Sequence, residues 1–319
     1  MKRRIVVWVL VALVLGFLAG VFATRAAWPT PTAQPSNYSF LAPEVARLDL
    51  AAFNEQQRYY HAYYTPLRTQ LREATPDDGT VAVYFEDLTT GEWIGIEERT
   101  PFRGASLLKI VTIATTLRAI SDGTLAFDTR LPLAPGNRDD RFGSLYDAQP
   151  NATFTVEELI AAAATSSDNT AANALHAATG MGAWWETFQG LGLPPIPLDE
   201  NITYVAVTAK GYSTALRNLY YSGYLRRRNS EYLLSLLAHT EFTDALSRGV
   251  PTNVPVAHKI GVYTVPNDPS QKQYHDCGIV YTEHPYILCV LTHGIPEEEA
   301  KSHIARISTI VYTYNQERE

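Results

Sequence analysis

The stretch Phe102–Leu117, FRGASLLKIVTIATTL, places a serine and a lysine three residues apart at the start of an apolar run. The run predicts a helix over Ala105–Arg118, with Ser106 in its first turn. Lys109 then lies on the same helix face as Ser106. A serine hydroxyl is a weak nucleophile, and a neutral amine beside it can take its proton. The stretch therefore predicts either a catalytic serine with its base or an ordinary amphipathic helix with a serine near its start.

The composition is that of a globular protein and limits the partners of the chain. Of the 319 residues, 46% are hydrophobic and 18% are charged, and the formal net charge is −7. A net negative charge argues against nucleic acid as a partner. Two cysteines are too few for a disulfide scaffold, and the eight histidines lack metal-ligand spacing. We therefore expect a monomer with no metal, no cofactor and no nucleic-acid partner.

The N-terminus carries basic residues followed by an apolar run. Lys2-Arg3-Arg4 precedes Ile5–Ala23, and these 19 residues are long enough for a membrane-spanning helix whose N-terminus is cytoplasmic. A cleaved signal peptide is the alternative, with Val21-Phe22-Ala23 as its cleavage site. Both interpretations place the rest of the chain outside the cytoplasm, either as a single-pass membrane protein or as a secreted one.

The chain divides into three segments. Residues 1–27 form the anchor or signal segment. Residues 28–43 contain four prolines among small polar residues and predict an extended linker. Residues 44–319 are expected to form one folded domain.

Within this domain, strand patterns stand at both ends and helical patterns fill the middle. The predicted elements include a helical stretch in Glu44–Ala74, a hairpin of Thr80–Glu86 with Glu92–Ile96, an interrupted helix over Thr208–Leu237, a strand over Val254–Tyr263, a hairpin of Cys277–Tyr281 with Tyr286–Leu291, and a final helix over Glu297–Tyr314. We expect an α+β fold in which one antiparallel sheet is built from both ends of the domain. An all-helical lobe comes from the middle, and the site lies between the two.

A second polar cluster interrupts the helical middle. Thr155 and Glu158 have the spacing of a capping box, which opens a helix. The polar segment Ser166–Asn173 follows, and its Ser, Asp and Asn residues favour a turn over a helix interior. By itself this segment is an interhelical loop in which Asp168 or Asn169 caps the next helix.

Three motifs stand in order along the chain: Ser106-x-x-Lys109, Ser167-Asp168-Asn169 and Lys259-Ile260-Gly261. Together they resemble the motifs of the serine β-lactamase and penicillin-binding protein superfamily, and of class A β-lactamase-related enzymes in particular. The resemblance extends from about Tyr64 to the C-terminus. It includes Thr155–Leu175, TVEELIAAAATSSDNTAANAL, which is similar to class A sequence.

The resemblance implies a role for each reactive side chain of the motifs. The Ser106 hydroxyl attacks an acyl carbonyl, and Lys109 takes part in removing its proton. Ser167 relays a proton to the leaving nitrogen, with the charge of Lys259 nearby. These groups supply what stepwise acyl transfer requires.

The resemblance also implies how the substrate is held. The Asn169 side chain hydrogen-bonds the substrate amide, and Gly261 lies in the substrate-binding strand. The backbone N–H groups of Ser106 and Val262 form the oxyanion hole, which requires a strand edge beside the helix N-terminus.

Three features depart from the class A pattern. The loop Leu191–Val207 is short and lacks the glutamate that activates the deacylating water. Glu200 is the candidate in its place, and a surface loop residue is the alternative. Ile260 stands where a threonine hydroxyl would help to bind the substrate carboxylate. The next strand offers no arginine for that carboxylate, and Lys272, although close, falls in a predicted loop.

Two further features concern the last strands. Cys277 and Cys289 flank a hairpin turn almost symmetrically, so they face each other either as a disulfide or as two buried thiols. His258 alternates to the strand face opposite Lys259, where a packing or supporting role is expected.

The leading hypothesis is an exported, membrane-tethered serine acyl hydrolase that acts on β-lactams or peptidoglycan peptides. The second is a D-alanyl-D-alanine peptidase, in which Lys109 is the base and no loop glutamate is needed. The third is a degenerate, non-catalytic domain that binds cell-wall peptide or a partner. The retained motif residues argue against the third, and the departures indicate altered specificity.

Overall fold

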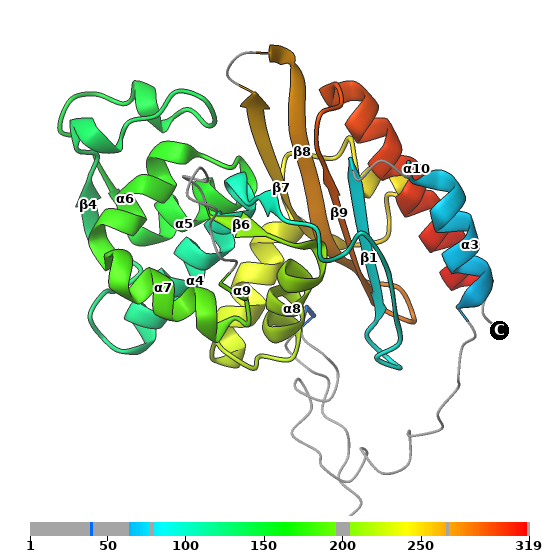
Figure 1. Ribbon diagram of the computed structural model, residues 1–319. Helices are drawn as coiled ribbons and strands as arrows, with labels where there is room; N and C mark the ends of the chain where they lie inside the picture. The colour runs from blue at the N-terminus through cyan, green and yellow to red at the C-terminus, as the bar shows by residue number, and fades with distance from the viewer. Residues whose placement is uncertain (1–38, 41–63, 77–79, 196–204, 266–267, 318–319) are drawn as a thin grey trace, which may run out of the picture.

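The computed structural model describes residues 39–40, 64–76, 80–195, 205–265 and 268–317. A five-stranded antiparallel sheet in the order β2-β1-β9-β8-β7 stands beside a lobe of helices (Figure 1). Its strands are β1 (Val81–Asp87), β2 (Trp93–Ile96), β7 (Val256–Val265), β8 (Asp268–Val280) and β9 (Tyr286–Thr292). Strands from both ends of the described domain share this sheet, so the predicted α+β fold is confirmed.

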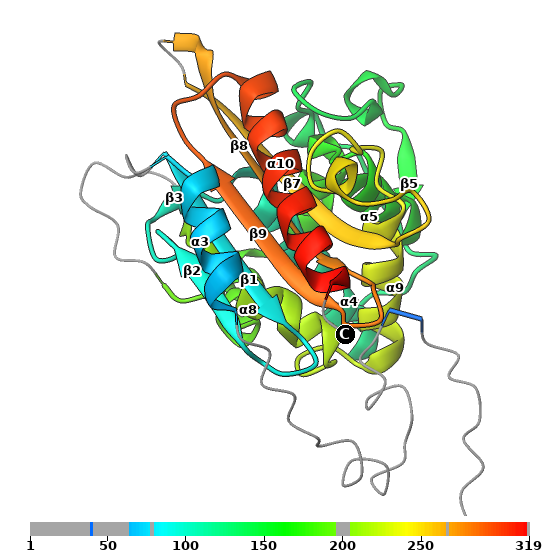
Figure 2. The same cartoon turned by 90° about the vertical axis from the view of Figure 1, so that its right-hand side faces the viewer.

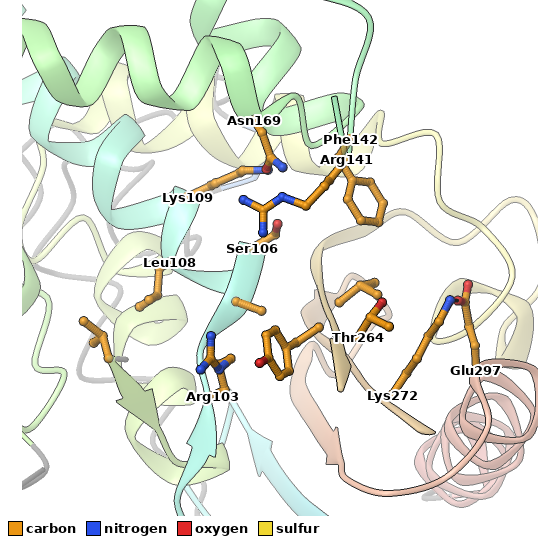
Figure 3. A pocket seen from close by; sticks show the side chains of 14 residues that line it. Arg103, Ser106, Leu108, Lys109, Arg141, Phe142, Asn169, Thr264, Lys272 and Glu297 are labelled. Atoms are coloured by element: carbon orange, nitrogen blue, oxygen red, sulfur yellow. Dashed lines mark hydrogen bonds and ion pairs between the residues drawn. The ribbon is translucent and has the colours of Figure 1, made fainter. Parts of the chain in front are cut away.

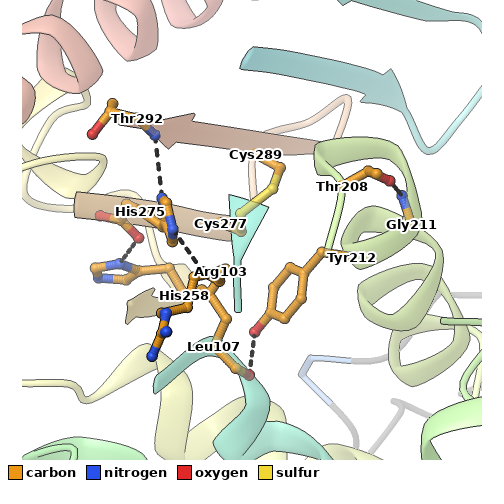
Figure 4. The surroundings of a disulfide bond; sticks show 11 residues. Arg103, Leu107, Thr208, Gly211, Tyr212, His258, His275, Cys277, Cys289 and Thr292 are labelled. Carbon is orange, nitrogen blue, oxygen red and sulfur yellow. Dashed lines mark hydrogen bonds and ion pairs between the residues drawn. A yellow bond between two sulfur atoms is a disulfide. The ribbon is translucent and has the colours of Figure 1, made fainter. Parts of the chain in front are cut away.

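The strands β8 and β9 form the predicted second hairpin. Cys277 lies opposite Cys289 in its register, and a disulfide joins the two residues with their Cα atoms 3.9 Å apart (Figure 4). The sequence left open a disulfide or two buried thiols, and the structure has the disulfide. The strand β7 pairs with β8 alone within the sheet, which leaves its other edge beside the helical lobe.

Two helices cover one face of the sheet. The helices α3 (Thr65–Ala74) and α10 (Glu297–Gln316) lie side by side on this face in Figure 2. Leu67 and Leu71 of α3 are fully buried, as is Ile304 of α10. These residues belong to one of the two apolar cores, and the opposite face of the sheet contributes to the other.

The helical lobe surrounds one central helix. Its helices are α4 (Lys109–Ser121), α5 (Val156–Thr165), α6 (Asn169–Thr179), α7 (Met181–Gly190), α8 (Ala209–Tyr220) and α9 (Arg227–Ala238). Every residue of α4 from Lys109 to Leu117 is buried, as expected for a helix enclosed on all sides. Its polar Thr112 accepts a hydrogen bond from the Trp184 indole at 3.1 Å. The capping box of Thr155 and Glu158 opens α5 as predicted.

The segment that carries the serine differs from its prediction. Residues Ala105–Leu108 form a 3₁₀ helix, η2, and the α-helix begins only at Lys109 and continues to Ser121. Ala105 has a left-handed φ of 44°, and the Tyr212 hydroxyl binds the Leu107 carbonyl at 3.1 Å (Figure 4). Tertiary contacts thus fix a tighter turn than helix propensity alone predicts.

Two other predicted elements have different bounds, and a third is confirmed. The strand β8 begins at Asp268, so Lys272 lies in a strand and its prediction as a loop residue is wrong. The predicted loop Leu191–Val207 ends in a short strand, β6 (Ala206–Val207), which pairs with β3 (Phe102–Arg103). A strand of two residues is too short to show alternation of apolar and polar residues in the sequence. It is recognised only by its pairing with another strand. The interruption in Thr208–Leu237 is confirmed between α8 and α9.

Four predictions concern residues outside the described ones. The apolar run Ile5–Ala23, the linker at 28–38 and 41–43, and the start of the domain at residue 44 lie there, as does Glu200. Among the described residues, no helix combines the length and apolarity needed to cross a membrane.

Candidate active site

Ser106 opens onto a cavity of about 630 Å³ between the helical lobe and the edge of β7 (Figure 3). Lys109 and Asn169 line the helical side of the cavity, and Val262 lines the strand side. In a 3₁₀ helix, side chains three residues apart eclipse each other, so Ser106 and Lys109 still share one face. The structure thus brings four of the predicted site residues to one cavity.

The Lys109 amine is buried among polar atoms of the second motif. Its Nζ donates to the Ser167 carbonyl and to Asn169 Oδ1 at 2.5 Å, and it lies 3.1 Å from Ser167 Oγ. The residue is only 7% exposed, and this burial lowers the pKa of Lys109 to about 7, against the opposing charges of Asp168 and Asp139. Near neutral pH a large fraction of this amine is therefore unprotonated, as a base requires.

The segment Ser167-Asp168-Asn169 forms the turn between α5 and α6, as predicted. The Asp168 side chain caps α6 by accepting from the Ala171 N–H at 2.8 Å, and its other oxygen accepts from the Leu145 N–H at 2.9 Å. Ser167 has a left-handed φ of 56° and is fully buried. Ser167 and Ala105, the residue before Ser106, thus both adopt a backbone conformation that is rarely populated and that surrounding contacts maintain.

A loop that the sequence analysis did not single out completes the helical wall. Residues 138–145, hereafter the Arg141 loop, add Arg141 and Phe142 to the cavity lining. Asp139 accepts a hydrogen bond from Asn169 Nδ2 at 2.9 Å and pairs with the Arg141 guanidinium. These interactions hold the pKa of Asp139 well below its usual range, with the Arg141 hydrogen bond as the largest cause. No motif marks this loop, since its contribution depends on packing against α6.

The third motif lies on the edge strand β7. The Lys259 amine is buried, with 1% of the residue exposed, and has no hydrogen-bond partner among the described residues. Burial, together with the charge of Lys109, lowers the pKa of Lys259 well below its usual value. A Cβ added to Gly261 would approach the Gly104 carbonyl to 3.2 Å and a Leu107 side-chain carbon to 2.9 Å. Glycine here lets β7 approach η2, which places Val262 at the cavity.

The opposite face of β7 carries a buried chain of polar side chains. His258 Nδ1 bonds Asp276 at 2.7 Å, and Ser247 Oγ bonds His258 Nε2 at 2.9 Å. The second Asp276 oxygen accepts from the Leu246 N–H at 3.0 Å. His258 thus faces away from Lys259, as predicted, and fixes β7 to β8 and to the short 3₁₀ helix η5 (Ser247–Gly249).

A second histidine connects the sheet to the segment before the serine. His275 bonds the Arg103 carbonyl at 3.0 Å and accepts from the Thr292 N–H at 3.2 Å (Figure 4). Burial lowers the pKa of His275 to about 4, so the imidazole is neutral near pH 7. Because Nδ1 accepts a hydrogen bond, the ring proton is on Nε2, which donates a hydrogen bond to the Arg103 carbonyl.

The end of the cavity farthest from α6 is charged. Lys272 and Glu297 both line it and form an ion pair at 2.7 Å (Figure 3). The Arg103 guanidinium stacks on the Tyr263 ring, 3.8 Å from its centroid. Among the described lining residues, Glu297 is the one carboxylate, and it also pairs with Lys301 at 2.9 Å. No group of metal-ligating side chains occurs among the described residues.

Comparisons with known proteins agree with this geometry. A model of the beta-lactamase enzyme family matches residues 66–315, whereas no curated protein matches the chain. Among solved structures, PBP-A is similar with a TM-score of 0.70 at 21% identity, over 79% of this chain and 97% of that one.

Two β-lactamase structures are similar to the same degree. The β-lactamase from Sphaerobacter thermophilus DSM 20745 has a TM-score of 0.69 at 21% identity, over 78% of this chain and 96% of its own. An ancestral class A β-lactamase, GNCA, has a TM-score of 0.68 at 23% identity, over 77% and 99%. These likenesses show a shared fold, and the family match covers most of the chain. The chain therefore belongs to the beta-lactamase enzyme family and is a serine hydrolase of the β-lactamase type.

Proposed function

We propose that this protein forms an acyl-enzyme on Ser106 with β-lactams or peptidoglycan peptides. The observation that carries the proposal is the buried amine of Lys109, whose pKa is lowered to about 7 and which shares a cavity with the Ser106 hydroxyl. A surface lysine on an amphipathic helix would keep its usual pKa, because water would solvate its charge.

The proposed reaction uses residues on both sides of the cavity. The unprotonated Lys109 amine takes the proton of the Ser106 hydroxyl as the oxygen attacks the carbonyl carbon. The N–H groups of Ser106 and Val262 stabilise the oxyanion, and Asn169 orients the substrate amide. Collapse of the tetrahedral intermediate breaks the C–N bond, and Ser167, in contact with Lys109, passes a proton to the leaving nitrogen. Water then hydrolyses the ester.

Deacylation has no evident base among the described residues. Glu297 is held by two lysines at the far end of the cavity, and Glu200 lies outside the described residues. A carboxylate engaged in two ion pairs is a poor proton acceptor for water. We therefore propose slow deacylation, which favours a D,D-peptidase-like enzyme as the second candidate. A mutant of the similar protein PBP-A was solved as an acyl-enzyme complex with penicillin G.

A non-catalytic role has less support. Burial of the Lys109 amine costs free energy, because the charged form loses its solvation by water. A domain that only binds peptide gains nothing from an amine with a lowered pKa, whereas a catalytic base requires one. The contacts of Lys109 with Ser167 and Asn169 of the second motif also support catalysis.

We also propose that the enzyme acts outside the cytoplasm, tethered to the membrane by Ile5–Ala23. The length of that apolar run and the basic residues before it support this location. The disulfide between Cys277 and Cys289 supports it independently, because such bonds persist in oxidising compartments.

Intact mass spectrometry of the full-length protein in detergent, incubated with benzylpenicillin, tests the proposal. We expect a penicilloyl adduct that persists on the wild type and that Ser106→Ala abolishes. Rapid product release with only a transient adduct would instead identify an efficient β-lactamase and disprove slow deacylation. Absence of adduct and of product, with D-alanyl-D-alanine peptides also left intact, would refute acylation on Ser106.

A further inference from the structure

The third motif itself, Lys259-Ile260-Gly261, offers no accessible cation to the cavity. Ile260 belongs to the apolar core under α10, and its partner across the strands is the anionic Asp276. The Lys259 amine is buried and lies 5.7 Å from the centroid of the Phe242 ring. A substrate carboxylate is therefore bound by a cation from elsewhere in the cavity lining, where Arg103, Arg141 and Lys272 are present.

Arg141 is a cation of the helical lobe in this lining. It lines the cavity of Ser106 and also a second cavity of about 450 Å³. Figure 3 shows its guanidinium near Ser106 and Asn169, on the opposite side of the serine from Lys272. The Arg141 side chain is 75% exposed, so a ligand can reach it.

The guanidinium of Arg141 is held in place on one edge. Its Nε donates to Asp139 Oδ1 at 3.0 Å, and Nη2 also donates to this carboxylate. Among the described residues, Nη1 has no hydrogen-bond partner. Asp139 in turn accepts from Asn169 Nδ2 at 2.9 Å, so Arg141 is coupled to the residue expected to hold the substrate amide.

The backbone of the Arg141 loop is equally well anchored. The Phe142 carbonyl accepts from the Asn169 N–H at 3.0 Å, and the Leu145 N–H donates to Asp168. At Gly143, whose φ is 84°, a Cβ would collide with the Asp168 carboxylate at 2.0 Å. The loop is therefore built against the second motif as a fixed wall of the cavity.

This wall packs against the segment that carries Ser167, through the hydrogen bonds of the loop to Asp168 and Asn169. The second cavity is lined by Ser166, next to Ser167, and by Phe242. The Phe142 and Phe242 rings meet across it with centroids 6.3 Å apart. Under the proposed function, Ser167 protonates the leaving nitrogen, so the groups attached to that nitrogen extend toward Arg141.

We infer that Arg141 binds the carboxylate that the substrate carries next to its leaving nitrogen. Arg141 is then a specificity determinant that comes from the helical lobe and not from the sheet. The inference rests on the proposed function. Penicillins and D-alanyl-D-alanine peptides both carry a carboxylate on the carbon attached to that nitrogen. The other lining cations are engaged at the opposite end, Lys272 with Glu297 and Arg103 on Tyr263.

The test compares benzylpenicillin with its methyl ester, which removes the charge of this group and adds one methyl group. Acylation rates of the full-length protein are measured by mass spectrometry over a range of concentrations. We expect the wild type to prefer the acid by about tenfold or more, as a charge-assisted hydrogen bond supports. Arg141→Ala brings the ratio toward one, chiefly by raising the concentration needed for half-maximal rate, and Arg141→Lys restores part of it.

Lys272→Ala and Arg103→Ala are the matched controls, because each removes one cation from the same cavity. We expect both to keep the wild-type ratio, and an unchanged melting temperature of Arg141→Ala shows that its fold is intact. A ratio unaffected by Arg141→Ala, lost in either control, or already near one in the wild type would overturn the inference. If neither compound acylates the wild type, the proposed function fails and the inference fails with it, an outcome distinct from acylation without preference.

Discussion

Lys109 and Lys259 are both buried, and burial lowers the pKa of each amine. The two residues influence each other, since the charge of Lys109 contributes to the low pKa of Lys259. Around Lys109, Asp139 and Asp168 raise the pKa while Arg141 lowers it. The protonation state of the proposed base is therefore set by burial and by charges on two segments, the Arg141 loop and the turn that carries Asp168, and single substitutions can shift it predictably.

The first prediction concerns the pH dependence of acylation. The unprotonated Lys109 is the active form, so the acylation rate rises with pH, with a midpoint at about 7. The Asp139→Asn variant removes a charge that raises this pKa and retains an oxygen that accepts from Asn169. Its midpoint moves below that of the wild type. Acylation rates measured from pH 5 to about 9 with a chromogenic β-lactam provide the profile.

The control for this prediction is Asp140→Asn, which removes an exposed carboxylate from the same loop. Asp140 is not among the charges that shift the pKa of Lys109, so its variant keeps the wild-type midpoint. A midpoint that moves upward in Asp139→Asn, or equally in both variants, would show that Lys109 does not control the profile.

At the scale of elements, the site depends on how closely β7 approaches η2. Gly261 lies against the Gly104 carbonyl and Leu107, while His275 joins the centre of the sheet to the Arg103 carbonyl. These contacts position the backbone of Ser106 and Val262, whose N–H groups are the proposed oxyanion donors. Such donors lose their effect when they shift by a fraction of an ångström.

The second prediction is that Gly261→Ala lowers the acylation rate by about 100-fold, the lower end of the effect of losing an oxyanion donor. The added Cβ forces β7 away from the turn that carries Ser106. Stopped-flow acylation measures the rate, and circular dichroism verifies that the fold is retained. Gly182→Ala is the control, because a Cβ there meets no atom within 4 Å, and it keeps the wild-type rate. Equal rates for both variants would contradict the role of close approach.

At the scale of the whole molecule, one sheet unites strands from both ends of the domain. The disulfide between Cys277 and Cys289 links β8 to β9, and β9 pairs on its other side with β1. The bond thus lies in the central part of the sheet, and the two apolar cores pack on the two faces of that sheet. Its effect on stability should extend to the entire fold.

The third prediction is that replacing both cysteines by alanine lowers the free energy of unfolding by about 3 kcal/mol, since the bond closes a short loop in the unfolded chain. Differential scanning calorimetry of the wild type and the double variant measures the change. Adding a reductant under denaturing conditions lowers refolded stability in the wild type but leaves the double variant unaffected. A double variant as stable as the oxidised wild type would contradict the prediction.

The sequence by itself determined the fold class and the elements that carry the three motifs. Apolar alternation at both ends and helical spacing in the middle are local properties, so the hairpins, the α5 cap and the break at Ser167-Asp168-Asn169 could be predicted. The residue spacing likewise placed Ser106 and Lys109 on one face. The order of the motifs then indicated the family, which the match of the family model to residues 66–315 shows.

Only the tertiary structure decided the features that arise from contacts between distant segments. The 3₁₀ turn at Ser106 depends on Tyr212, and the burial that lowers the pKa of Lys109 depends on the lobe that encloses it. The Arg141 loop carries no motif, and its approach to the nucleophile follows from hydrogen bonds to α6. Local patterns encode secondary structure because its hydrogen bonds are local, whereas the charge environment of a site depends on packing between residues far apart in sequence.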